Sequence, residues 1–264
     1  MKSPFKSLVL ALALGSLPGA GWSAADTPAP VELNVYAAAS LTDAMKEIAA
    51  NYQKVGGARI ALNFGASSAL ARQIVEKAPA DVFLSADEAK MNDLEKQGLV
   101  LKGTRRSLLS NTLVIVVPAD SALKIASARD LAGPQVKAIA LCEPQTVPAG
   151  IYAQQYLRKI NVWDQVVKKL VPTENVRAAL AAVESGNVDA GIVFKTDAGV
   201  SKEVKVALEI PAAEGPAISY PVAVLSGSTK AEAARKFVAY LESPAGIGVF
   251  RKYGFLIRPG SPAP

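Results

Sequence analysis

Two serines stand where strand-like runs of the chain give way to helix-like runs. Ser40 lies in "VYAAASLTDAM" and Ser67 in "NFGASSALARQIV", and small residues precede each of them. A serine at this place is a typical helix N-cap, and we expect Ser40 to cap the helix that follows it. The hydroxyl and the free N–H groups of a helix start can also donate to an anion. The chemistry that these residues suggest is therefore anion binding by uncharged donors.

Two further helix starts offer backbone donors alone. "PQTVPAGIYAQQY" enters its helix through residues with almost no side chain, among them Ala149 and Gly150. "VPTENVRAALAAVESG" begins a helix near Asn175 and Val176, and Gly186 ends it as a C′ residue. Taken singly, each of the four starts is as well explained by ordinary helix capping. Their number and matched placement carry the inference that they bind one ligand.

The four starts carry almost no positive charge. Arg177, just beyond Val176, is the one basic residue beside them. An anion that still holds a proton needs an acceptor, for which a carboxylate is the natural group. A neutral site made of donors therefore favours a fully ionised oxyanion, such as molybdate or sulfate, over phosphate.

The composition excludes several classes of function. The chain has no histidine, which removes the commonest zinc ligand and the usual base of a serine hydrolase, and we expect no metal cation site and no cofactor. Cys142 is the one cysteine, so no disulfide forms within the chain. Lys and Arg are scattered rather than clustered, which argues against a nucleic-acid partner.

An exported serine hydrolase remains the rival from another class. Ser40 or Ser67 would be the nucleophile, and the partner would be Asp81, Asp87 or Lys195. No Ser-x-x-Lys motif surrounds either serine, so the sequence gives this reading little support. A scaffold without any ligand is a third reading.

The first 25 residues have the pattern of a cleaved signal peptide. Lys2 and Lys6 precede an apolar run that is too short to span a bilayer, and Ser23 and Ala25 occupy the small-residue positions of a cleavage site. We expect the mature chain to begin at Asp26 and to lie in the periplasm. Cleavage would lower the formal charge from +6 to +4.

Strand and helix patterns alternate along the mature chain, which is typical of α/β lobes with mostly parallel sheets. The mature length exceeds that of a usual single core, which favours two lobes. We predict strands at 33–37, 59–64, 81–85, 113–117, 138–141, 190–194 and 220–225, and helices at 41–54, 69–77, 88–97, 151–159, 176–184, 230–241 and 244–252.

A weak internal repeat suggests that the two lobes share their connectivity. In "EKAPADVFLSADEA" and in "ESGNVDAGIVFKTDAG", a helix end is followed by a strand that an aspartate leads, Asp81 or Asp189. The spacing to the next aspartate, Asp87 or Asp197, differs by two residues between the copies, so chance is the alternative explanation.

At these residues the sequence closely resembles the periplasmic molybdate-binding proteins of molybdate ABC transporters. The motifs "AAASLTDAM", "ARQIVEKAPADVFLSAD", "VPAGIYA", "ENVRAALAAVE", "YPVAV" and "RKYGF" occur in that family's order between Leu33 and Ile257. The resemblance implies a type II periplasmic-binding-protein fold with two hinge crossings, near 108–113 and 220–225. It divides the chain into a signal peptide (1–25), a discontinuous first lobe (26–108 and 221–264) and a second lobe (109–220).

The resemblance also implies the ligand and its donors. A molybdate or tungstate oxyanion would be bound by the hydroxyl and N–H groups of Ser40 and Ser67 and by the N–H groups of Ala149 and Val176. The family commonly adds a tyrosine hydroxyl where this chain has Phe194, which cannot donate. The expected partner is an ABC permease in the inner membrane, and the expected state is a monomer. A sulfate-type receptor is the nearest alternative within the class.

Overall fold

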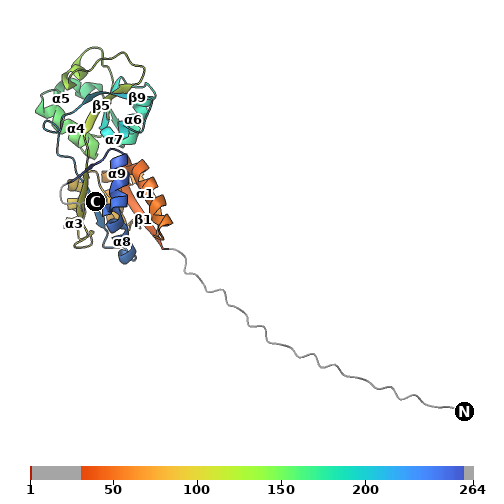
Figure 1. The fold of residues 1–264 in the computed structure, drawn as a ribbon. Helices are drawn as coiled ribbons and strands as arrows, with labels where there is room; N and C mark the ends of the chain where they lie inside the picture. Colours follow the sequence, from red (N-terminus) through yellow and green to blue (C-terminus); the bar gives the residue numbers. More distant parts are fainter. Residues whose placement is uncertain (2–30, 259–264) are drawn as a thin grey trace.

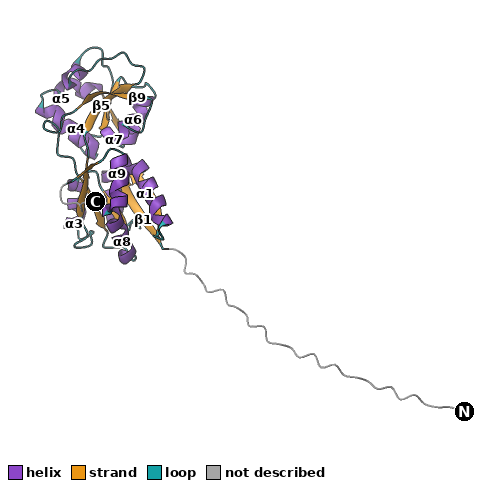
Figure 2. Cartoon of the chain, in the orientation of Figure 1, coloured by secondary structure: helices purple, strands orange, loops and turns teal. Residues whose placement is uncertain are grey.

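A computed structural model describes residue 1 and residues 31–258 of the chain. These residues form two lobes, one above the other in Figure 1, and each lobe is a sheet covered by helices (Figure 2). The two-lobed α/β fold expected from the sequence is thereby confirmed. Apart from Met1, the expected signal peptide lies outside the described residues. Within the described part of the chain, no helix has the length and apolar character needed to cross a membrane.

The first lobe is built on a six-stranded mixed sheet of order β11-β4-β10-β3-β1-β2. Strands β1, β2 and β3 run parallel, so their carboxyl ends meet at one edge, whereas β10 and β4 are antiparallel to their neighbours. The elements of this lobe are β1 (Glu32–Ala38), η1 (Ala39–Leu41), α1 (Thr42–Lys54), β2 (Arg59–Gly65), α2 (Ser67–Val75), β3 (Val82–Leu84), α3 (Glu88–Lys96), β4 (Arg106–Ser110), β10 (Tyr220–Val224), α8 (Ala231–Glu242), α9 (Pro244–Lys252) and β11 (Leu256–Ile257).

The second lobe is built on a five-stranded mixed sheet of order β7-β6-β8-β5-β9, in which β7, β6 and β8 are parallel. The carboxyl ends of these three strands face the first lobe. The elements are β5 (Leu113–Pro118), η2 (Ala128–Ala132), β6 (Ile139–Cys142), α4 (Pro148–Lys159), α5 (Trp163–Val166), η3 (Val167–Lys169), β7 (Leu170–Thr173), α6 (Val176–Glu184), β8 (Ala190–Phe194), α7 (Lys195–Ala198) and β9 (Val204–Glu209).

The chain crosses between the lobes twice. The first crossing, at Asn111 and Thr112, joins β4 to β5 and lies within the range expected from the sequence. The return crossing differs from the expectation: residues 220–225 contain strand β10 itself, and the passage from β9 precedes it, over residues 210–219. The strongly apolar pattern of β10 identified a strand correctly but could not show where the chain enters it.

The predicted strands and helices are present, but two helices begin earlier than predicted and several short elements, including helices α5 and α7, were not predicted. Helix α2 begins two residues earlier than predicted and α4 three residues earlier, because the first turns of both helices consist of small or cyclic residues without an apolar pattern. Strands β4, β7, β9 and β11 were not predicted. Strands β7, β9 and β11 lie at sheet edges, and β7 contains Pro172, so their sequences lack the apolar run of a central strand.

The internal repeat corresponds to equivalent contacts of Asp81 and Asp189 in the two lobes. Asp81 precedes β3 and accepts a hydrogen bond from the backbone N–H of Asn34 on the neighbouring strand β1. Asp189 precedes β8 and accepts hydrogen bonds from the N–H groups of Lys137 and Ala138, just before the neighbouring strand β6. In both lobes the aspartate therefore fixes the start of one parallel strand against the next.

Candidate functional site

The five residues predicted for the site line one small cavity between the lobes. Its volume is about 20 Å³, and its walls come from the segments that follow β1, β2 and β3 in the first lobe and β6, β7 and β8 in the second. The lining residues are Ala38, Ala39, Ser40, Gly65, Ala66, Ser67, Ala86, Val147, Pro148, Ala149, Asn175, Val176 and Phe194. The carboxyl ends of parallel strands thus converge on the cavity from both sides.

Ser40 lies at the cavity in a local structure that the sequence did not predict. The expected N-cap role is wrong, because the chain enters α1 through the 3₁₀ turn η1, and the residue before the helix is Leu41. The Ser40 hydroxyl instead lies 3.1 Å from the hydroxyl of Tyr220, and both side chains are buried. Tyr220 was not predicted to take part, and its distance in sequence from Ser40 left no spacing signal.

Ser67 is the first residue of α2 and is also buried. Its Oγ accepts a hydrogen bond from the backbone N–H of Ala86, at 2.9 Å. Because a backbone N–H can only donate, the acceptor role of the Ser67 oxygen is fixed, and its own proton remains available to a second group. Ala86, which follows β3, was likewise not predicted.

Helix α4 approaches the cavity closely because its first turn contains Gly150. A Cβ atom at this position would lie 2.2 Å from the carbonyl oxygen of Cys142, so a larger residue would push the helix away from β6. Ala149, the second residue of the helix, therefore presents its N–H group at the wall of the cavity as part of the first, unpaired turn.

Helix α6 begins at Val176, as the sequence predicted, and Asn175 caps it. The Asn175 side chain accepts hydrogen bonds of 3.0 Å from the N–H groups of Arg177 and Ala178. This cap does not use the N–H of Val176, the first residue of the helix and a lining residue of the cavity. The predicted stop at Gly186 also holds, since its φ is +68°.

Phe194 ends β8 and lines the cavity with an aromatic ring. The ring packs edge-on against Tyr152 and Tyr220, with centroid distances of 6.5 and 5.9 Å. The position where the resemblance led us to expect a tyrosine thus faces the cavity but supplies no hydrogen-bond donor.

None of the described residues that line the cavity carries a charged side chain. Arg177 follows the lining residue Val176, and its guanidinium lies 2.7 Å from Asp43 of α1 and 2.7 Å from Asp197 of α7. Both contacts are ion pairs. Arg177 thereby links the two lobes beside the cavity.

Asp197 is fully buried, and this burial raises the pKa of its carboxyl group to about 6, although Arg177 pulls the pKa in the opposite direction. Burial also raises the pKa of the Tyr220 hydroxyl well above its ordinary value. Tyr220 is therefore protonated at neutral pH and can act as a hydrogen-bond donor.

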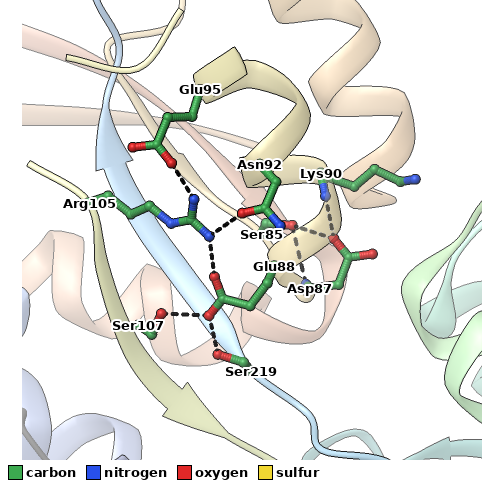
Figure 3. Close-up of polar contacts among 9 residues, drawn as sticks. All are labelled: Ser85, Asp87, Glu88, Lys90, Asn92, Glu95, Arg105, Ser107 and Ser219. Carbon is green, nitrogen blue, oxygen red and sulfur yellow. Dashed lines mark hydrogen bonds and ion pairs between the residues drawn. The ribbon is translucent and has the colours of Figure 1, made fainter. Parts of the chain in front are cut away.

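A second polar cluster anchors the return crossing to the first lobe (Figure 3). Glu88, at the start of α3, accepts hydrogen bonds from Ser107 of β4, from Ser219 just before β10, and from Arg105. Burial by itself would raise the pKa of Glu88, but these three hydrogen bonds outweigh it and lower the pKa. The cluster fixes the chain at the point where it enters β10.

The groups named for a hydrolase are not brought together. Asp81 binds Asn34 and Ser228, and Asp87 caps α3 by accepting from the N–H of Lys90. Lys195 forms an exposed ion pair with Glu209. The arrangement can bind an anion through neutral donors, but it does not pair either serine with these candidate partners.

The comparisons with known proteins agree with this geometry. Residues 33–256 match the family model described as bacterial extracellular solute-binding protein. The chain is 41% identical to the molybdate-binding protein ModA of Escherichia coli, over 86% of this chain and 90% of that protein. It is 39% identical to ModA of Haemophilus influenzae, over 90% of this chain and 93% of that protein.

A solved structure shows the same fold. The periplasmic molybdate-binding protein of Azotobacter vinelandii superimposes with a TM-score of 0.78 at 24% identity, over 86% of this chain and 100% of that chain. The resemblance stated from the motifs is confirmed, and the chain belongs to the family of bacterial extracellular solute-binding proteins.

Proposed function

We propose that the chain is the periplasmic receptor of an ABC transporter and that it binds molybdate, with tungstate as a second ligand, in the cavity between its lobes. The observation that carries the proposal is the composition of the cavity wall: two serine hydroxyls and the starts of α4 and α6, with no charged side chain among the described lining residues. The similarity to molybdate-binding proteins over most of the chain supports the choice of ligand.

The ligand-binding groups in this proposal are the hydroxyl and N–H groups of Ser40 and Ser67 and the N–H groups of Ala149 and Val176, while Phe194 contributes an apolar wall. A tetrahedral dianion has four acceptor oxygens and needs only donors. The molybdenum is held as an oxyanion and not through protein ligands to a metal cation.

The same proposal covers the transport cycle. Residues 1–25 direct export and are removed, residues 26–108 and 221–264 form one lobe, and residues 109–220 form the other. Ligand binding stabilises the closed form, which a membrane permease recognises and unloads. The protein acts as a monomer and catalyses no reaction.

A thermal-shift panel tests the ligand. Ligands that bind only the folded state raise the melting temperature, by about 10 °C at a concentration a thousandfold above Kd for a chain of this size. We expect molybdate and tungstate to raise the melting temperature of the mature chain, and phosphate to leave it unchanged. A larger shift with sulfate than with molybdate would identify a sulfate receptor instead, and the absence of a shift with any oxyanion would contradict the proposal.

A further inference from the structure

The two serines at the cavity differ in what holds their hydroxyl groups. The Ser67 oxygen accepts from a backbone N–H, so its proton is turned away from that contact. For Ser40 the hydrogen-bonding neighbour is another hydroxyl, that of Tyr220, and either oxygen could be the donor. The direction of this one hydrogen bond decides whether Ser40 can donate to a ligand.

Asn111 settles the direction. Its Oδ1 accepts a 2.9 Å hydrogen bond from the N–H of Thr112, which assigns the two ends of the side-chain amide. The Nδ2 group therefore faces outward and donates its two protons to Tyr220 Oη, at 3.2 Å, and to Thr196 Oγ1, at 2.9 Å. Tyr220 Oη is thus an acceptor toward Asn111.

A phenol has a single proton, and the Tyr220 oxygen already receives one from Asn111. Among the described residues, the other hydrogen-bonding contact of this hydroxyl is Ser40 Oγ. A buried proton needs an acceptor, so the Tyr220 proton lies on that line. Ser40 then accepts from Tyr220, and its own proton is left to point into the cavity that Ser40 lines. The chain of donors runs from Asn111 through Tyr220 to Ser40.

We propose that Tyr220 is a positioning residue for oxyanion binding: it donates to Ser40 and thereby turns the Ser40 hydroxyl proton toward the ligand, while Asn111 orients Tyr220. This inference rests on the proposed function, because it concerns the same cavity. It also explains a preference for fully ionised anions. With its own proton directed at the ligand, Ser40 meets the ligand as a donor and does not accept the proton of hydrogen phosphate at that place.

Asn111, Tyr220 and Thr196 also connect the donors to the passages between the lobes. Asn111 lies in the first crossing between the lobes and Tyr220 directly follows the return crossing, while Thr196 belongs to α7 of the second lobe. Both crossings therefore contribute to the orientation of a single donor. The side chains of Ser40, Asn111, Thr196 and Tyr220 are all buried, which shields these hydrogen bonds from bulk solvent.

Isothermal titration of the mature protein with molybdate tests the proposal in a double-mutant cycle. Tyr220→Phe removes only the hydroxyl and is expected to weaken binding about tenfold, the effect of one hydrogen bond to a charged ligand. In a Ser40→Ala background the same substitution is expected to change Kd less than about twofold, because the group that Tyr220 orients is gone.

A second readout separates positioning from general packing. In Tyr220→Phe the Ser40 hydroxyl is free to rotate and can accept from hydrogen phosphate, so the ratio of the phosphate Kd to the molybdate Kd is expected to fall about tenfold, whereas a packing defect would weaken both anions alike. Tyr52→Phe is the matched control: Tyr52 is buried in the same lobe against Phe237 and Tyr240 and is not among the residues lining the cavity. It should leave both constants unchanged.

The outcomes are distinct. If wild-type protein binds molybdate and Tyr220→Phe binds it equally well, or if the effects of Tyr220→Phe and Ser40→Ala are additive, the positioning role is wrong and the proposed function stands. If wild-type protein binds neither molybdate nor tungstate, both are wrong. Should Tyr220→Phe fail to fold, Asn111→Ala keeps the tyrosine and releases its hydroxyl. This variant is expected to weaken molybdate binding about threefold, and an unchanged Kd would overturn the role.

Discussion

Phe194 is the residue at which this chain departs from the pattern of the family it resembles. Its ring lines the cavity and is almost fully buried, so a para-hydroxyl added to it would lie close to the ligand or to the neighbouring rings of Tyr152 and Tyr220. The direction of that hydroxyl decides whether position 194 becomes a fifth residue that donates to the ligand.

We predict that Phe194→Tyr leaves the molybdate affinity unchanged or tightens it by up to about tenfold, since a hydrogen bond to a buried charge contributes about 1.5 to 3 kcal/mol and reorganisation of the packed ring offsets part of it. Calorimetry measures the change, and Tyr156→Phe, a buried tyrosine of α4 outside the cavity lining, serves as control. Clear weakening, with an unchanged melting temperature, would show that the position supplies packing rather than a place for a donor.

At this scale the sequence predicted which residues meet and missed how they are held. The small residues around Ser40, Ser67, Ala149 and Val176 indicated a donor-lined site, because small side chains leave backbone groups accessible. The contacts that orient the serines come from Tyr220 and Ala86, which lie far away in sequence. Only the folding of β1, β2, β3 and β10 into one sheet brings them together.

At the scale of an element, different groups in the first turn of α6 cap the helix and face the ligand. Asn175 satisfies the N–H groups of Arg177 and Ala178, so the helix is capped without the N–H of Val176. Asn175 is extended, with φ −157° and ψ 171°, which is the conformation that a following proline requires. Proline is also favoured at the first position of a helix.

Val176→Pro should therefore remove one backbone donor and leave α6 intact. We expect molybdate binding to weaken about tenfold or more while the circular dichroism spectrum is retained. Val176→Ala keeps the N–H and shortens the side chain, so it serves as the matched control and should bind within about threefold of wild type. Equal affinities of the proline and alanine variants would mean that this N–H does not reach the ligand.

The sequence patterns predicted some element boundaries well and others poorly. The starts of α6 and α9 were predicted correctly. Each helix is preceded by a residue of a typical capping type, Asn175 or Ser243, whose side chain caps it. Helix α1 is entered through a 3₁₀ turn that no residue type marks. Edge strands such as β9 were missed because exposed residues interrupt their apolar pattern.

At the scale of the whole molecule, Arg177 joins the lobes. Its contact with Asp197 lies within the second lobe, whereas its contact with Asp43 joins the second lobe to the first. Both partners of the spanning pair keep part of their side-chain surface in solvent, 25% for Arg177 and 35% for Asp43. An ion pair of this kind contributes up to about 1 kcal/mol.

We predict that Asp43→Asn weakens molybdate binding about two- to fivefold, mainly through faster dissociation, because it destabilises the closed form and leaves the cavity wall unchanged. Stopped-flow displacement measures the rate. Glu232→Gln removes the partner of Lys236 in an exposed pair within α8 and should have no effect. Equal dissociation rates for Asp43→Asn and wild type would show that the contact does not stabilise closure.

Asp197 gives the folded molecule a characteristic dependence on pH. Its carboxyl faces Arg177 and, at longer range, Asp43, Cys142 and Tyr220, and its folded-state pKa of about 6 exceeds its ordinary value of 3.8. Between these two values the folded state holds a proton that the unfolded state has released. The contribution of Asp197 to stability is therefore fully present below pH 3.8 and is lost as the pH rises through 6.

Asp197→Asn removes this titration, so the difference in unfolding free energy between wild type and variant should fall by about 2 kcal/mol from pH 4.5 to pH 7. Urea denaturation of the ligand-free protein at the two pH values measures it, and other carboxyl groups cancel in the difference. Asp120→Asn, at an exposed turn, is the control and should show a constant difference. A constant difference for Asp197→Asn as well would mean that Arg177 keeps the carboxylate ionised, and that the link between the lobes is insensitive to acid down to pH 4.5.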